Sequence, residues 1–281
     1  MTYSIVARDP VTGDLGVAVQ SHYFAVGPVV PWLRPGVGAV ATQAMVDVGY
    51  GPKALDLLST GTAPAEALAD LLAQDPQAAT RQVAVVRADG QVATHTGERC
   101  ITEAGHRNGD GWSVQANMMT NATVPDAMAT TYAAGVKRGD DLPTRLLDVL
   151  DAAEHEGGDI RGRQSAALVI VSGDPETPPW DRRYDVRVDD AREPLDELRR
   201  LVAVRRAYLT SDVDHAALGG NPELRFWQAL ALATTQHQVD EARTILDGIY
   251  ADDDRWRELL RRLPASGNLP DDPALLAALT D

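Results

Sequence analysis

Cysteine and phenylalanine are scarce in this 281-residue chain, and it lacks long hydrophobic runs. The single cysteine, Cys100, excludes an internal disulfide framework and a zinc site built from several cysteines. No apolar run approaches the ~18–20 residues of a membrane span. The first residues also lack the basic segment and continuous apolar segment of a signal peptide. These absences predict a soluble, cytoplasmic protein without a membrane partner.

Positive charge is also in short supply. The chain has 26 Lys and Arg against 41 Asp and Glu, a net charge of −15. Such a charge repels the phosphates of nucleic acids, so we expect no nucleic-acid partner. Hydrophobic residues make up 44% of the chain, which is ordinary for a globular protein. The length allows one large domain, or a main domain with an appendage.

The most informative stretch is the first twenty-one residues. Residues 2–8 alternate loosely between polar and apolar side chains and predict a strand. Residues 9–14 contain Pro10 and Gly13, which favour a turn. Residues 15–19 are nearly all apolar and predict a second strand that is covered on both faces. A hydroxyl residue, Thr2, therefore stands at the start of a strand, directly after Met1.

Thr2 gains a chemical role if Met1 is removed, which is expected before a residue this small. Its α-amine, with a pKa near ~7.7–8.0, can then take the proton from its own hydroxyl. The alternative is that a small second residue means only that Met1 is lost, and Thr2 taken alone favours this alternative. If Met1 is retained, Ser4 or Cys100 is the rival nucleophile. Strand alternation puts Ser4 on the same face as Thr2, so Ser4 is expected to line the same cleft.

The order of the expected elements indicates an α+β fold. Strands are expected over residues 2–8, 15–19, 36–43, 81–87, 91–96, 112–119, 164–172 and 184–188, and residues 28–32 are expected to be extended. Helices are expected over 53–59, 64–74, 124–134, 142–156 and 194–206. Runs of one type, rather than strict alternation, favour stacked sheets with helices on the outer faces.

From Tyr208 onward no strand pattern remains, and helices are expected over residues 223–236, 239–250, 255–263 and 273–279. The segment Gly219–Pro222 is expected to end a linker. We therefore predict a domain over residues 1–207 and a small all-helical domain over residues 208–281. The second has six Arg and thirteen Asp or Glu, a net charge of −7.

Several stretches resemble the DUF1028 family, bacterial proteins assigned to the N-terminal-nucleophile (Ntn) hydrolase superfamily. They are TYSIVARDPVTGDLGVAVQS (2–21), VVPWLRPGVGAVATQ (29–43), YGPKALDLL (50–58), TGERC (96–100), WSVQANMM (112–119) and GGDIRGRQSAAL (157–168). The resemblance covers roughly residues 2–190 and implies a four-layer αββα sandwich and amide hydrolysis. The chain departs from the family at Ala116, where a glycine is usual, and before Ala104, where a tryptophan is usual.

The resemblance also implies roles for individual residues. Thr2 would be the nucleophile, and Arg34, from a neighbouring strand, would lower the pKa of its amine electrostatically. The alternative for Arg34 is a surface residue before a turn. Asp159 and Ser165 resemble the pair that holds the amine and the nucleophile in proteasome-like enzymes. Alternatively, Asp159 makes only a structural ion pair with Arg161.

Four further residues complete the expected site. Asn117, with nearby backbone amides, would stabilise an oxyanion, or else would only satisfy buried backbone groups. Ser21 would bond the α-amine or simply finish its strand. Gln43 and Asp47 are expected at the mouth of the pocket. With Ser4, these residues form the expected substrate-binding set.

The sequence predicts neither a metal nor a cofactor. His95, Cys100 and His106 match no zinc spacing, and a single Cys near a strand is usually a small buried hydrophobe. The leading hypothesis is an Ntn-type amidohydrolase acting on a small amide, peptide-like or ureide substrate, with a homodimer as the default assembly.

The second hypothesis is a non-catalytic protein that binds cell-wall fragments or a protein partner. It arises because the C-terminal helices resemble a peptidoglycan-binding segment often appended to such proteins. Their negative charge argues against anionic wall polymers.

Overall fold

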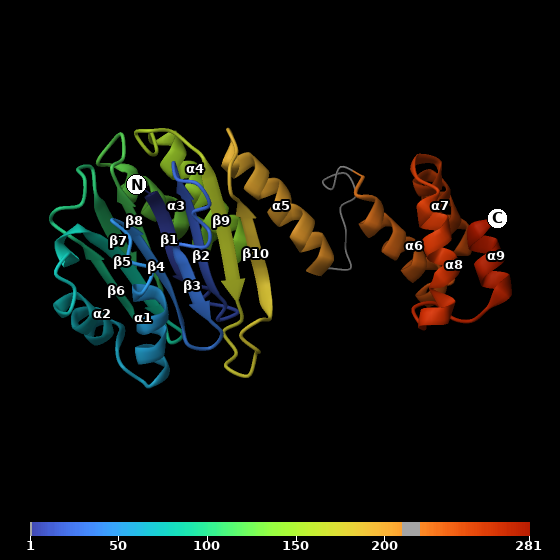
Figure 1. Cartoon of the computed structure of the whole chain (residues 1–281), viewed down its shortest axis with the longest axis horizontal. Coiled ribbons are helices and arrows are strands. Elements are labelled where there is room, and N and C mark those ends of the chain that lie inside the picture. Colours follow the sequence, from blue (N-terminus) through green and yellow to red (C-terminus); the bar gives the residue numbers. More distant parts are fainter. Residues whose placement is uncertain (1, 210–219) are drawn as a thin grey trace. The chain divides into compact units, whose positions relative to one another are not determined.

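The computed structural model describes residues 2–209 and 220–281 (Figure 1). Met1, whose removal is expected, lies outside the described residues. So does Gly219, the first residue of the segment expected to end the linker. The chain divides into two compact units, Met1–Val202 and Ala203–Asp281. The sequence places this division five residues later, at 207/208.

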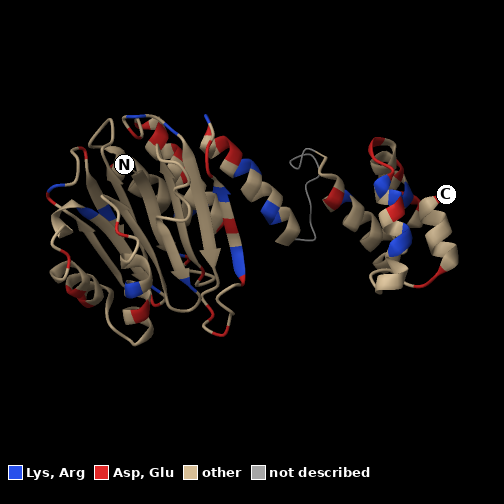
Figure 2. Cartoon of the chain, in the orientation of Figure 1, with Lys and Arg blue, Asp and Glu red and all other residues tan. Residues whose placement is uncertain are grey.

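The first unit contains a six-stranded antiparallel sheet in the order β10-β9-β2-β1-β8-β7. Its strands are β1 (Thr2–Arg8), β2 (Leu15–Ser21), β7 (Gly105–Gly109), β8 (Trp112–Asn117), β9 (Ser165–Val171) and β10 (Arg182–Val188). The strand that begins with Thr2 therefore lies inside the sheet, between β2 and β8. The inner strands carry almost no charge because they are buried on both faces, whereas the edge strand β10 is rich in Arg and Asp (Figure 2).

A second antiparallel sheet has the order β3-β4-β5-β6. Its strands are β3 (Pro31–Arg34), β4 (Gly38–Ala44), β5 (Arg81–Arg87) and β6 (Val92–Thr96). A short turn at Ala88–Gly90 joins β5 and β6 as the sequence predicts, and the two strands pair from Val86↔Val92 to Gln82↔Thr96.

Four helices cover the outer faces of the two sheets (Figure 1). Helices α1 (Tyr50–Ser59) and α2 (Pro64–Ala73) pack on the four-stranded sheet, and α3 (Val124–Arg138) and α4 (Leu142–His155) pack on the six-stranded sheet. The two sheets contact each other through their inner faces. The predicted four-layer αββα sandwich is therefore confirmed.

Each contact between layers has its own apolar core. The core between the sheets contains Val6, Val17 and Val19 from the six-stranded sheet and Ala39 and Ala41 from the four-stranded sheet. Toward the end of the sandwich where β1 begins, the facing side chains become polar although they remain buried. Buried polar groups cost free energy unless they are paired, so the polar side chains at this end need hydrogen-bond partners.

One glycine allows α1 to lie close to the sheet beneath it. A Cβ atom added at Gly51 would lie 2.1 Å from Cγ of Trp32 on β3. No larger residue fits there without moving the indole ring, which donates from Nε1 to the carbonyl of Val29. Gly51 therefore sets the spacing between helix and sheet.

Helix α5 (Pro194–Leu209) begins in the first unit, where Leu198 and Val202 pack in the core under α4. The second unit contains α6 (Pro222–Thr235), α7 (Val239–Asp252), α8 (Arg255–Arg262) and α9 (Pro273–Thr280). Their shared core includes Phe226, Leu246 and Leu260. No helix within residues 2–209 and 220–281 is long and apolar enough to cross a membrane.

Candidate active site

Thr2 lies in a line of polar residues at one end of four adjacent strands. It pairs with Asn117 on β8, and its hydroxyl donates to Ser21 Oγ on β2 over 3.1 Å. Ser21 pairs in turn with Ser165, the first residue of β9. All four residues are buried, and Thr2 is 4% exposed. The sheet topology alone thus brings four of the expected site residues side by side.

Two side-chain amides hold the carbonyl of Thr2. Gln43 Nε2, from β4 of the opposite sheet, donates to it over 3.1 Å, and Asn117 Nδ2 donates over 3.3 Å. The same two nitrogens also donate to Gln82 Oε1, over 2.7 and 2.8 Å. Gln82 is fully buried and connects the two sheets at this point. Both hydrogens of the Asn117 amide are engaged in this way, as in the alternative in which Asn117 satisfies buried groups.

Ser4 is deeper in the sandwich, on the same face of β1. Its hydroxyl donates to Gln43 Oε1 over 2.6 Å and accepts from Gln115 Nε2. Gln115 Oε1 accepts from Ser113 Oγ over 2.9 Å. Ser4 has no exposed surface. Its role here is to connect the polar side chains of the two sheets, which makes it a poor rival nucleophile.

Asp159 lies beside the end of β2. Gly157 and Gly158, with φ of 111° and 56°, end the α4 segment and direct the chain toward Asp159. The carboxylate accepts from the backbone N–H of His22 over 3.1 Å and from the backbone N–H of Arg161 over 2.9 Å. It also pairs with the Arg161 guanidinium over 3.0 Å. The ion pair weighed as the alternative is thus present, together with a direct bond to the residue after Ser21.

Ser165 fixes the loop that follows β2. Its hydroxyl donates to the carbonyl of Tyr23 and accepts from the backbone N–H of Val26 over 3.1 Å. The loop contains Ala25, a non-glycine residue in the left-handed region with φ of 53°. Ser165 therefore holds a strained loop beside the site.

Arg34 does not lie beside Thr2. It pairs with Gly38 at the start of β4, whereas Gln43, which contacts Thr2, is five residues further along that strand. At about 3.3 Å per residue, this separation is roughly 16 Å. The Arg34 guanidinium instead forms a half-exposed ion pair with Asp56 on α1, over 2.7 Å. The expectation that Arg34 lowers the pKa of the Thr2 amine is therefore corrected.

Asp47 also has a local role. Its carboxylate accepts from the backbone N–H of Gly49 over 2.8 Å, and its carbonyl accepts from Thr42 Oγ1 over 3.0 Å. The residue lines a cavity of about 190 Å³ between α1 and the segment after α2, together with Tyr50 and Asp75. Thr2 is not among the residues that line it. The structure thus separates Asp47 from the line of polar residues at Thr2.

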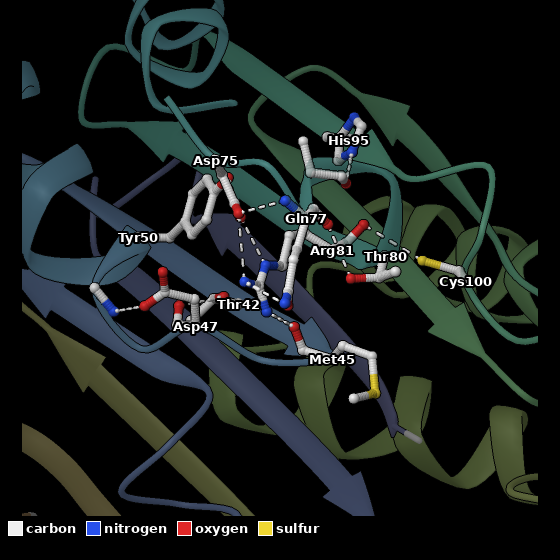
Figure 3. Close-up of polar contacts among 12 residues, drawn as sticks. Thr42, Met45, Asp47, Tyr50, Asp75, Gln77, Thr80, Arg81, His95 and Cys100 are labelled. Carbon is white, nitrogen blue, oxygen red and sulfur yellow. Dashed lines mark hydrogen bonds and ion pairs between the residues drawn. The ribbon is translucent and has the colours of Figure 1, made fainter. Parts of the chain in front are cut away.

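An ion pair at the edge of this cavity connects several segments (Figure 3). Arg81 Nε lies 2.7 Å from Asp75 Oδ2, and the Tyr50 hydroxyl donates to the same oxygen over 3.0 Å. The hydrogen bond from Arg81 lowers the pKa of Asp75 to about 2. Arg81 also donates to the carbonyl of Met45, and its own carbonyl accepts from the Cys100 thiol over 3.3 Å. Burial raises the pKa of that thiol.

A small apolar pocket lies on the other side of Arg81. We name it the Cys100 pocket; it has a volume of about 60 Å³ and is lined by Ala44, Met45, Thr80, Cys100, Ile101 and Asn117. Sequence reasoning considered Cys100 as a rival nucleophile, a metal ligand or a buried hydrophobe, and did not associate it with Asn117. Gln115 was also missed, although Ser113, Gln115 and Asn117 alternate with apolar residues in β8, a signal that they face one side of the sheet. Gln82 was missed too, and the apolar residues that follow it in β5 give no such signal.

The two histidines near Cys100 have partners of their own. His95 Nε2 lies 2.8 Å from the carbonyl of Ala78, and His106 Nδ1 lies 2.9 Å from Thr96 Oγ1. Burial and the nearby charge of Arg107 lower the pKa of His106. Across residues 2–209 and 220–281, no three His, Cys, Asp or Glu side chains converge so that they could hold a metal ion.

Residues 2–198 match the model of a family of unknown function, DUF1028. The crystal structure of protein SPO2555 from Silicibacter pomeroyi, described with the same family model, matches with a TM-score of 0.65 and 29% identity over 77% of this chain and 90% of that one.

A weaker structural match is Anbu (ancestral beta-subunit) from Yersinia bercovieri, with a TM-score of 0.34 and 9% identity over 74% of this chain and 96% of that one. An Anbu (Gly-1) mutant from Hyphomicrobium sp. strain MC1 matches with a TM-score of 0.35 and 13% identity over 75% of this chain and 97% of that one. No curated protein matches the sequence.

Proposed function

Because the chain belongs to the DUF1028 family, whose function is unknown, we propose from its own residues that it is an Ntn-type amidohydrolase. Thr2 would cleave a small amide, peptide-like or ureide substrate. The observation that carries the proposal is the setting of Thr2: a hydroxyl at the start of an inner strand, hydrogen-bonded to Ser21 and surrounded by buried polar side chains. The hydrogen bonds among these side chains offset the cost of burying them and hold Thr2 in one position.

In this reaction the α-amine of Thr2, free after loss of Met1, acts as the base. It takes the proton from Thr2 Oγ1 while the oxygen bonds to the substrate carbonyl carbon. The tetrahedral intermediate then breaks its C–N bond, and the protonated amine gives its proton to the leaving nitrogen. Water, activated by the same amine, hydrolyses the resulting ester and releases the acid. Nucleophile and base belong to one residue, so the chemistry requires no cofactor.

The neighbouring residues support this chemistry by positioning. Gln43 and Asn117 hold the Thr2 carbonyl, so the backbone that carries the nucleophile is fixed from two sides. Ser21 accepts from the hydroxyl and orients Oγ1. Asp159 bonds the backbone of His22, so its negative charge lies close to the amine end of the site. In the proposal Asn117 is a positioning residue and not the donor to the oxyanion.

The test is the intact mass of the purified protein before and after reaction with a panel of acyl electrophiles and small amides. We expect a mass without Met1 and one added acyl group that maps to Thr2. Thr2→Ala keeps a small second residue, so Met1 is still removed, but it lacks the hydroxyl and should take no acyl group. Thr2→Ser retains the hydroxyl and should still be acylated.

A protein that keeps Met1 and is still acylated would overturn the proposal, as would an adduct at Ser4 or Cys100. If Thr2 takes no acyl group from any reagent although Met1 is absent, the non-catalytic binding protein becomes the better hypothesis. Ser4→Ala is the matched control, because Ser4 has a hydroxyl on the same face of β1 but is fully buried.

A further inference from the structure

The Cys100 pocket adjoins the residues that hold Thr2. Asn117, which donates to the Thr2 carbonyl, is part of its lining, and Ala44 follows directly after Gln43, the second donor. The remaining lining is mostly apolar, and the side chains of Met45 and Ile101 are 58% and 49% exposed. The pocket therefore shares Asn117 with the residues that hold the proposed nucleophile, although Thr2 itself does not line it, and it carries large apolar side chains that are half open to solvent.

The backbone at this end of the sandwich makes room for the pocket. Strand β4 ends at Ala44 with φ of 69°, and the residue after β8, Met118, has φ of 56°. Non-glycine residues in the left-handed region are strained, and such strain collects at functional sites. Both strands leave their sheets at these two residues.

The lining is also fixed in place. Arg81 donates to the carbonyl of Met45 and accepts from the Cys100 thiol through its own carbonyl, while its guanidinium is paired with Asp75 (Figure 3). Met45 and Cys100, on two sides of the pocket, are therefore attached to one residue that is itself held by an ion pair. A pocket with a fixed lining can select its ligand by size and shape.

The two sides of Thr2 differ in chemistry. Its hydroxyl contacts Ser21 on β2, where the neighbouring side chains are polar. Its carbonyl contacts Gln43 on β4 and Asn117 on β8, and the apolar Cys100 pocket adjoins these two residues. An aliphatic acyl group fits the apolar side better than the polar one, because burying it beside unpaired polar groups would cost free energy.

The size of the pocket restricts the acyl group. One water-sized group takes roughly 10–15 Å³ on this measure, so a volume of about 60 Å³ holds roughly four to six such groups. We propose that the Cys100 pocket binds the aliphatic part of the substrate acyl group and that the substrates are amides of short linear or branched aliphatic acids. This inference rests on the proposed function, because it names the substrate class of the same site.

Cys100 supplies a direct assay because it is the only cysteine of the chain. The full-length protein is alkylated with iodoacetamide in the presence of acetate, isobutyrate, isovalerate, hexanoate or decanoate, which are products of the proposed reaction. We expect isovalerate or hexanoate to slow labelling most. At a concentration of about ten times its dissociation constant, the best acid should slow labelling roughly tenfold.

Two exposed apolar residues provide the test variant and its control. Ile101→Ala removes a lining side chain, so the strongest protection should move to a longer acid. Val48→Ala removes a side chain that is similarly exposed, 44%, but does not line the pocket, and it should leave the preference unchanged. Both positions are at the surface, so neither variant should prevent folding.

Equal protection by acids of every length, or an unchanged preference in Ile101→Ala, would overturn the inference. Protection of Cys100 requires no turnover, so a failure of this inference is distinguishable from a failure of the proposed function. If Thr2 forms no acyl adduct, size-dependent protection of Cys100 still identifies an aliphatic binding site. If Thr2 is acylated but protection does not depend on length, the reaction stands and this pocket is not where the acyl group binds.

Discussion

At the scale of single residues, Gln43 and Asn117 both hold the carbonyl of Thr2. Their amides converge on the Thr2 carbonyl from two different sheets, and Gln82 receives the remaining hydrogens of both. A buried polar cluster is favourable only when its members are paired, so the position of Thr2 depends on the hydrogen bonds among these three amides.

The most informative residue to change is Asp159, because it has two kinds of partner. Asp159→Asn removes its negative charge beside Ser21 and the ion pair with Arg161, whereas Arg161→Gln removes the ion pair alone. We expect both to destabilise the fold by about 1–3 kcal/mol, the cost of an unpaired buried group. Only Asp159→Asn should slow acylation of Thr2, by about tenfold, which corresponds to roughly 1.4 kcal/mol of barrier.

Denaturant unfolding and the rate of acylation measure the two effects separately. Equal losses of acylation rate in both variants would reduce Asp159 to a structural ion pair, the alternative that the sequence leaves open.

At the scale of elements, the connection between α2 and β5 holds the helical layer to the four-stranded sheet. Asp75 follows α2, Arg81 opens β5, and Tyr50 opens α1, and their side chains meet at one point (Figure 3). The pair is only 11% exposed on each side, so solvent screens it less than the surface pairs.

This ion pair predicts how stability changes in acid. The pKa of Asp75 in the folded protein is lowered to about 2, below its usual value of 3.8, so folding favours the ionised form. The contribution is complete above about pH 4 and is lost as the pH falls toward 2, and after allowance for residual solvent screening it is about 1–2 kcal/mol. The wild type should therefore exceed Asp75→Asn in free energy of unfolding at pH 5, and the difference should shrink toward pH 2.

Urea unfolding of both proteins at pH 5, 4, 3 and 2 measures this difference directly. A difference that stays constant across the series would mean that the carboxylate charge of Asp75 contributes nothing to stability. Asp56→Asn is the matched control, because its pair with Arg34 is 70% exposed on the aspartate side and should contribute little at any pH.

At the scale of the whole molecule, every residue of the candidate site lies in the first compact unit, Met1–Val202. The second unit has its own apolar core, centred on residues such as Phe226 and Leu246. Each unit thus buries its own hydrophobic surface, which is the physical requirement for independent folding.

A chain that ends after Leu209 keeps all of α5 and removes the four C-terminal helices. We expect it to remain folded and to be acylated at Thr2 at a rate within roughly twofold of the full-length protein, since each unit has its own apolar core. Circular dichroism and the acylation assay test the two parts of the prediction. A folded but unreactive fragment would show that the helical unit takes part in the reaction.

Local pattern determined most of the elements. Alternation and turn residues predict the two strands that open the chain, and helix periodicity places α4 within a residue of its observed end at His155. One strand, β7, was missed: Gly105–Gly109 has no apolar alternation, and it forms a strand because its backbone pairs with β8. Asp110–Gly111 joins it to β8, and an Asp-Gly pair between two strands is a hairpin signal that could have found it.

In the candidate site, some features follow from local sequence patterns and others depend on the tertiary structure. The sequence by itself determined that a hydroxyl residue begins a buried strand, that Ser4 shares its face, and that the helices and strands follow the order of an αββα sandwich. Only the tertiary structure decided that Gln82 joins Gln43 and Asn117, that Arg34 pairs with Asp56, and that Asp47 lies at a separate cavity. The periodicity of a strand fixes which face a side chain occupies, but its partners are set by sheet order and register, which depend on contacts between residues far apart in the chain.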